Sequence, residues 1–138
     1  MRRISSSLTA AALATIAGLH VAWGRGSSFP FASKSELSDA VVGSHAAPSA
    51  GACYAVAAAL FAASALVADL PVAPRRVRRL GRRVVGGVLA TRGVVGLAGR
   101  TDLLSPGSAS VRFRRLDRRY FSPLCLALAA GSQAQIRR

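Results

Sequence analysis

Along the chain, long segments without charged residues are separated by segments that contain most of the charge. Four blocks are free or nearly free of charge, at residues 4–24, 46–68, 84–99 and 120–136. The second block has no charged residue, and a helix of its length roughly matches the ~30 Å hydrocarbon core of a bilayer. The pattern therefore predicts an all-α integral membrane protein, with four transmembrane helices in one bundle over residues 1–138.

We place the four spans at residues 4–24, 46–69, 84–101 and 117–136. Pro48 and Ser49 suit the first turn of the second span, because an amide is not needed for hydrogen bonding there. Small residues spaced by four in that span favour close helix packing in lipid; they are Gly51 with Ala55 and Ala58 with Ala62. The fourth block is short, so we expect its helix to begin at Asp117 as N-cap.

Three polar connectors separate the spans, at residues 25–45, 70–83 and 100–119. Residues 35–39 of the first predict a short interfacial helix. The second is expected to be a proline-containing basic hinge that contacts anionic lipid; its arginines are Arg75, Arg76, Arg78, Arg79, Arg82 and Arg83.

The composition supports a membrane protein and excludes several other classes. The net charge is +14, yet 51% of the residues are hydrophobic and only 17% are charged, which does not fit disorder. Nucleic-acid binding is not expected, because no zinc-finger, RNP or basic-zipper pattern is present and aromatic residues make up only 6%. Arginine clusters beside apolar helices are ordinary in membrane proteins, where they set orientation.

The positive-inside rule gives a divided result for the orientation. A cytoplasmic N-terminus places Arg25 and Lys34 of the first connector outside and the six arginines of the second connector inside. It also places six arginines of the third connector outside, against the rule; they are Arg100, Arg112, Arg114, Arg115, Arg118 and Arg119. A three-span alternative, in which the block around Arg92 does not cross, removes this conflict.

Residues 4–24, with Arg2 and Arg3 before them, also have features of a signal peptide: a basic start, an apolar middle and small residues at Ala22 and Gly24. Cleavage there would release a secreted basic binding protein. Trp23 is bulky for a position beside a cleavage site, so an uncleaved first span is the preferred interpretation.

Several segments in order along the chain resemble a family of small bacterial membrane proteins, domain of unknown function 3995. They are residues 19–24 (LHVAWG), Pro48, Arg92-Gly93 with Gly96, and most specifically residues 112–126 (RFRRLDRRYFSPLCL). The resemblance implies four transmembrane helices and adds no known activity. Members often carry an acidic residue soon after the Arg-Gly step, whereas Leu97, Ala98 and Gly99 stand here.

The strongest candidate site residue is Arg92, because a charged side chain inside a span must find a partner in the bundle interior. It would serve an anion site or a charge relay, or fix helix register. Asp117 can cap the last helix or pair with Arg92 or Arg100. With His20 and Tyr120 these residues would lie near the outer face and form a polar cluster.

His20 and Trp23 share a helix face, because they are three residues apart. Trp23 fits the interfacial aromatic belt. His20 either forms one hydrogen bond beside it or titrates near neutral pH. Cys53 and Cys125 lie in apolar blocks and are expected to pack as small hydrophobes, with a disulfide as the alternative. No catalytic constellation, cofactor site or metal site can be assembled from the sequence.

We therefore expect a small non-enzymatic membrane protein that assembles with itself or with another subunit. The alternative is a small transporter or a proton or anion relay that uses Arg92, His20 and Asp117.

Overall fold

The computed structural model describes residues 2–44, 46–103 and 110–134. The helices are α1 (Arg2–Gly24), α2 (Lys34–Val41), α3 (Ala50–Val67), α4 (Arg75–Leu97), α5 (Val111–Leu116) and α6 (Ser122–Gln133). A 3₁₀ turn, η1 (Thr101–Leu103), follows α4, and a π-helical segment, η2 (Asp117–Phe121), joins α5 to α6. The described part of the chain contains no strand, so the predicted all-α class is confirmed.

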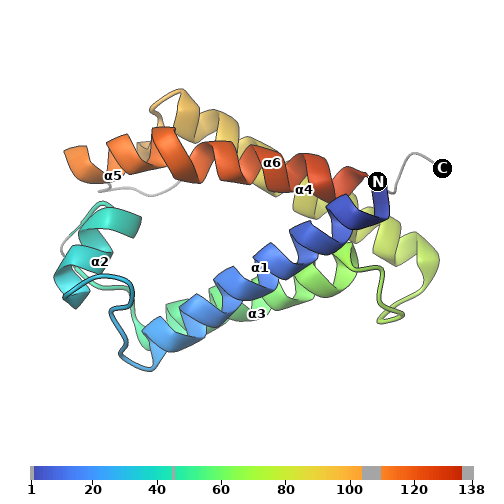
Figure 1. Cartoon of the computed structure of the whole chain (residues 1–138), viewed down its shortest axis with the longest axis horizontal. Coiled ribbons are helices and arrows are strands. Elements are labelled where there is room, and N and C mark those ends of the chain that lie inside the picture. Colours follow the sequence, from blue (N-terminus) through green and yellow to red (C-terminus); the bar gives the residue numbers. More distant parts are fainter. Residues whose placement is uncertain (1, 45, 104–109, 135–138) are drawn as a thin grey trace.

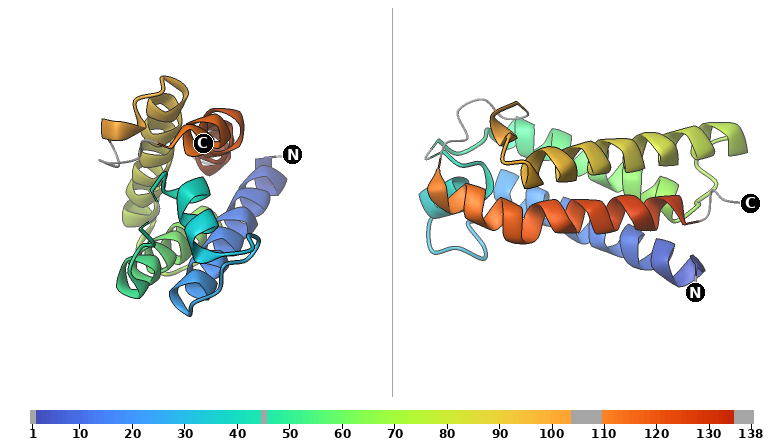
Figure 2. Two further views of the ribbon diagram at one scale, coloured as in Figure 1. Left: turned by 90° about the vertical axis from the view of Figure 1, so that its left-hand side faces the viewer. Right: turned by 90° about the horizontal axis from the view of Figure 1, so that it is seen from above.

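The long helices form two antiparallel pairs, α1 with α3 and α4 with α6 (Figure 1). The pairs meet at the end of the molecule that holds the N-terminus and diverge toward the other end, where α2 lies between them (Figures 1 and 2). An apolar cluster holds the meeting end together, with Leu13 of α1, Val67 at the end of α3 and Leu128 of α6 all buried. Ser64 adds a hydrogen bond of 2.8 Å from its hydroxyl to the Ala10 carbonyl.

Helix α2 closes the diverging end and confirms the short helix expected at residues 35–39. Ser33 is its N-cap and accepts a hydrogen bond from the Glu36 amide at 3.2 Å. The helix contacts α5, and the Ser110 amide donates to the Gly43 carbonyl at 3.2 Å. The first and third connectors therefore lie side by side.

Three predicted boundaries are wrong. Residues 75–83 are not a hinge but the first turns of α4, because Pro74 precedes the helix and arginine is a good helix former. The helix of the predicted second span begins at Ala50, with Ser49 as its N-cap instead of in its first turn. The last helix begins at Val111 rather than Asp117, because Ser110 accepts from the Phe113 amide at 3.4 Å and so supplies the cap. Residues 135–136 of the predicted fourth span lie outside the described residues.

Among the described residues, two helices are long and apolar enough to cross a membrane. They are Ile4–Gly24 within α1 and Ala50–Val67, which is α3. Helix α4 has the length but carries six arginines in its first turns and Arg92 further on. The π segment divides the last helix, so that α6 alone has only 12 residues.

The small-residue faces expected to pack α3 are exposed; they are Gly51 with Ala55 and Ala58 with Ala62. Close helix contact occurs instead on α4. A Cβ on Gly93 would lie 2.7 Å from Leu126 Cγ, and one on Gly86 would overlap the Gln133 side chain. Glycine on α4 therefore lets α6 approach closely.

Candidate functional site

Arg92 and Asp117 form an ion pair between α4 and the π segment. The guanidinium donates from Nη2 to Asp117 Oδ1 at 2.5 Å and from Nη1 to Oδ2 at 3.3 Å. The Asp117 side chain is fully buried, whereas 30% of the Arg92 side chain is exposed. The pair is thus a two-point contact whose carboxylate is sealed, while part of the arginine side chain remains exposed.

Ser122 completes this buried network, which we call the arginine–aspartate network: Arg92, Asp117 and Ser122. The Ser122 hydroxyl donates to Asp117 Oδ2 at 3.0 Å and is itself fully buried. Asp117 and Ser122 are five residues apart and lie on one face here because the π segment widens the helix between them. Such segments occur frequently at functional sites.

Gly96 provides the space for the network. A Cβ at this position would overlap Ser122 Oγ and Asp117 Oδ2 and would lie 2.6 Å from Arg92 Nη1. Only glycine leaves room for the three polar side chains between α4 and the last helix. Glycine at position 96 therefore allows the Arg92 guanidinium to reach Asp117.

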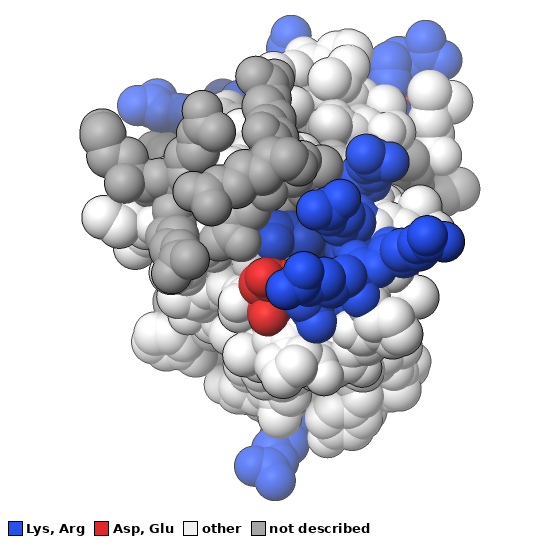
Figure 3. All heavy atoms as spheres, turned by 90° about the vertical axis from the view of Figure 1, so that its right-hand side faces the viewer, with Lys and Arg blue, Asp and Glu red and all other residues white. Residues whose placement is uncertain are grey.

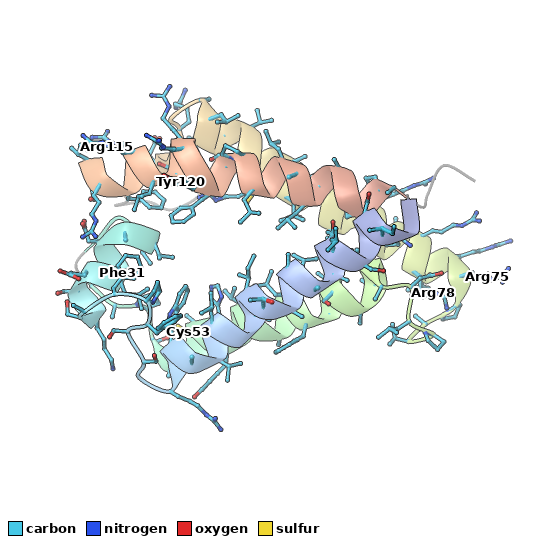
Figure 4. All side chains as sticks on the ribbon, viewed as in Figure 1. Phe31, Cys53, Arg75, Arg78, Arg115 and Tyr120 are labelled. Atoms are coloured by element: carbon cyan, nitrogen blue, oxygen red, sulfur yellow. The ribbon has the colours of Figure 1, made fainter. Side chains whose placement is uncertain are left out.

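Arg92 also lines a cavity of about 430 Å³ between the two helix pairs, under α2. We call it the inter-pair pocket. Most of its lining is apolar, with Leu37 and Val41 from α2, Val56 from α3 and Phe113 from α5. Its polar lining groups include Arg92, Lys34, Ser38 and His20. Figure 4 shows Cys53, another lining residue, on α3 at the diverging end.

His20 and Trp23 lie together on the pocket wall, as their spacing predicts. Their ring centroids are 4.8 Å apart with the planes inclined by 56°. His20 Nδ1 lies 2.9 Å from the Ile16 carbonyl, which can only accept, so Nδ1 carries the proton. Trp23 Nε1 donates to the Phe29 carbonyl at 2.7 Å. Both rings are held by backbone acceptors, and neither pairs with the arginine–aspartate network.

Two predicted cluster residues lie outside the site. Arg100 is exposed and approaches Asp102, also exposed, at 4.0 Å, so Asp117 pairs with Arg92 and not with Arg100. Tyr120 is 54% exposed and lies beneath the Arg119 guanidinium at 5.6 Å (Figure 4). The outer polar cluster is therefore smaller than expected.

Both cysteines are free thiols in the structure. Cys53 is buried on α3 and Cys125 is partly buried on α6, which fits the packing role rather than the disulfide. Among the described residues, no group of three or more His, Cys, Asp or Glu side chains is placed to hold a metal ion.

Sequence reasoning missed Ser38, Lys34, Phe113 and Ser122. Lys34 and Ser38 come from the first connector, and only the packing of α2 against α5 brings them near Arg92. Ser122 could have been found only by anticipating the π segment, because a regular α-helix would not align it with Asp117.

Comparison with known proteins gives one positive result. A family model described as "Protein of unknown function (DUF3995)" matches residues 13–132. No curated protein matches the chain. No solved structure matches it either.

Proposed function

The chain belongs to the DUF3995 family of proteins of unknown function, and we propose that it is a four-span membrane protein that acts as a non-enzymatic assembly or accessory subunit. In this proposal its N-terminus is cytoplasmic and its partner is a second copy or another membrane subunit. Bilayer lipid surrounds its apolar faces.

The observation that carries the proposal is an exposed aliphatic stripe on α4, which lies beside exposed arginines and opposite a face where Val85 and Leu89 pack against the apolar cluster. Its buried positions are small or charged: Arg82, Gly86, Gly93 and Gly96. Its outer stripe is apolar and more than half exposed: Val77, Leu80, Val84, Val88 and Val94. A helix on a water-soluble core would bury such a stripe. A helix in lipid favours small residues on the face toward the other helices and aliphatic residues on the face toward the acyl chains.

Helix lengths support four crossings. Helix α4 has 23 residues, and α5, η2 and α6 together cover residues 111–133 without a break. At 1.5 Å per residue, each is about 35 Å long, so each can cross a bilayer with its arginine-rich first turns in the headgroup region and the residues after them in the hydrocarbon core. Arg92 and Asp117 can lie at membrane depth because they neutralise each other inside the bundle.

The contact between α2 and α5 favours four crossings over three. It places the first and third connectors at the same end of the molecule. If α4 did not cross, the third connector would lie on the opposite side of the bilayer from the first.

The opposite end carries the basic surface that we assign to anionic lipid. Lys and Arg side chains gather there, and Arg75 and Arg78 lie beyond the meeting end of the helix pairs (Figures 3 and 4). Arg78 also pairs with Asp69 at 3.1 Å. Arginines beside the apolar spans fit the cytoplasmic leaflet, where anionic lipid attracts them.

The alternatives are less well supported. A relay through Arg92 would have to pass the apolar cluster around Leu13, Val67 and Leu128 to reach the buried polar side chains at the meeting end, such as Arg82 and Ser132. A secreted form cleaved after Gly24 would lose α1, which packs along the length of α3 and supplies Leu13 to the core.

Sidedness is tested with single cysteines in a background with Cys53 and Cys125 replaced by serine. We expect Ser35→Cys and Val111→Cys to react with an impermeant maleimide in intact cells, and Val72→Cys to react only after permeabilisation. All three positions are exposed, so access to the reagent is matched. Protection of Val111→Cys together with Val72→Cys would overturn the four-span proposal in favour of three spans.

A further inference from the structure

We propose that the inter-pair pocket binds a single-chain amphiphile with an anionic head, such as a fatty-acid carboxylate or a lysolipid phosphate monoester. The proposal rests on the membrane placement above, because the bilayer would supply such a molecule. It goes further by assigning a ligand class to a defined cavity.

The first observation is an unpaired hydroxyl. Ser38 is only 1% exposed and lines the pocket, and its Oγ has no hydrogen-bond partner among the described residues. A buried polar group without a partner destabilises a fold by roughly 1–3 kcal/mol. The hydroxyl is not open to the cavity in this structure, so an acceptor bound in the pocket would satisfy this donor after the Ser38 side chain turns toward it.

The second observation is positive charge around the same cavity. Lys34 lines the pocket and has no ion pair among the described residues. Arg92, which also lines the pocket, uses two of its five N–H donors on Asp117, so other donors remain for a ligand. The only acidic groups of the described residues that contact Arg92 belong to Asp117, which lies behind the guanidinium and does not line the pocket. The pocket therefore offers donors and cations to an anion.

The third observation is the apolar wall, which requires more than a free anion. Leu37, Val41, Val56 and Phe113 line the same volume, and about 430 Å³ is within the range of small-molecule sites. A small ion would leave these side chains without contacts, whereas an acyl chain would cover them. The head would lie at Ser38, Lys34 and Arg92, with the chain against α3.

Binding is measured with cis-parinaric acid, a fluorescent fatty acid, on the full chain reconstituted in phosphatidylcholine vesicles. Trp23 is the single tryptophan of the protein and lies on the pocket wall, so it is a built-in energy donor. We expect saturable energy transfer from Trp23 that unlabelled oleate and lysophosphatidate reverse and oleyl alcohol does not. Partition into the bilayer alone gives transfer that rises without saturation.

Two substitutions separate binding from folding. Ser38→Ala removes the unpaired hydroxyl, so we expect a higher thermal stability without ligand and about ten-fold weaker binding. Lys34→Gln is expected to weaken binding by a similar factor, about ten-fold. Ser35→Ala and Arg25→Gln are matched controls, because both residues are exposed, lie near the same end and do not line the pocket. Neither control should change the affinity.

Several results would overturn the inference. They are transfer that does not saturate, equal displacement by oleyl alcohol, equal weakening by the control variants, and displacement by inorganic phosphate alone. The last would indicate a free-anion site. Failure here with the labelling pattern expected for four spans would remove the ligand and leave the proposed function standing. Saturable binding with a three-span labelling pattern would overturn the four-span proposal and leave the ligand site standing.

Discussion

Replacing Arg92 by leucine is expected to lower the free energy of unfolding by about 3–5 kcal/mol, the usual effect of removing one partner of a buried ion pair. The Asp117 carboxylate is fully buried and would keep only the Ser122 hydroxyl as a donor. It would have to remain charged without a counter-ion or take up a proton. Denaturation of the purified protein in mixed detergent micelles, followed by circular dichroism, measures the change.

A double-mutant cycle separates the pair from the separate effects of each side chain. Arg92→Leu combined with Asp117→Leu removes both charges, so we expect the double variant to be more stable than either single variant. Arg100→Leu is the matched control. Its partner Asp102 is 4.0 Å away and both side chains are more than 60% exposed, so the change should be at most about 1 kcal/mol. Additive single effects in the cycle would show that the pair does not stabilise the fold.

The same variants distinguish the two functional hypotheses. If the arginine–aspartate network is structural, Arg92→Leu reduces the yield of assembled protein, and the double variant restores it. If Arg92 carries protons or anions, the double variant should assemble normally yet lose flux in reconstituted vesicles. Restored assembly with no flux in the parent protein would favour the assembly role.

The sequence identifies the apolar elements well, since long uncharged blocks leave few alternatives to helices. The starts of α1 and α2 follow from local pattern, whereas the pairing of Asp117 with Arg92 is one of three roles that the sequence leaves open for this carboxylate. The beginnings of α4 and α5 do not follow from local pattern, because arginine is both a typical connector residue in membrane proteins and a good helix former. Hydropathy therefore could not tell a basic hinge from a basic first turn at residues 75–83.

The inter-pair pocket lay further beyond sequence reasoning. It depends on the divergence of the two helix pairs and on the position of α2, both of which are set by contacts between distant segments. Ser38 looked like an ordinary polar residue of a surface helix. Only the tertiary structure shows that it is buried and that its hydroxyl has no partner among the described residues.

Gly96→Ala is expected to be the most damaging single-methyl change in α4. The added Cβ would overlap Ser122 Oγ and Asp117 Oδ2, so α4 would have to move away from the last helix or the network would have to break. Overpacking alone costs about 1–3 kcal/mol. Weakening of the buried ion pair adds to this, so we expect a total loss of at least about 2 kcal/mol. The same detergent denaturation measures it.

Gly87→Ala provides the matched control, because it makes the same chemical change in the same helix with open space around it. No atom lies within 4 Å of a Cβ at Gly87, so the substitution should stabilise α4 by about 0.5–1 kcal/mol through helix propensity. The two variants should therefore shift stability in opposite directions. Combining Gly96→Ala with Ser122→Ala removes one of the overlapping atoms and should recover part of the loss. Equal stability of the two glycine variants would mean that α4 and the last helix do not pack as closely as Gly96 requires, and the network would then lose its claim to hold the pair together.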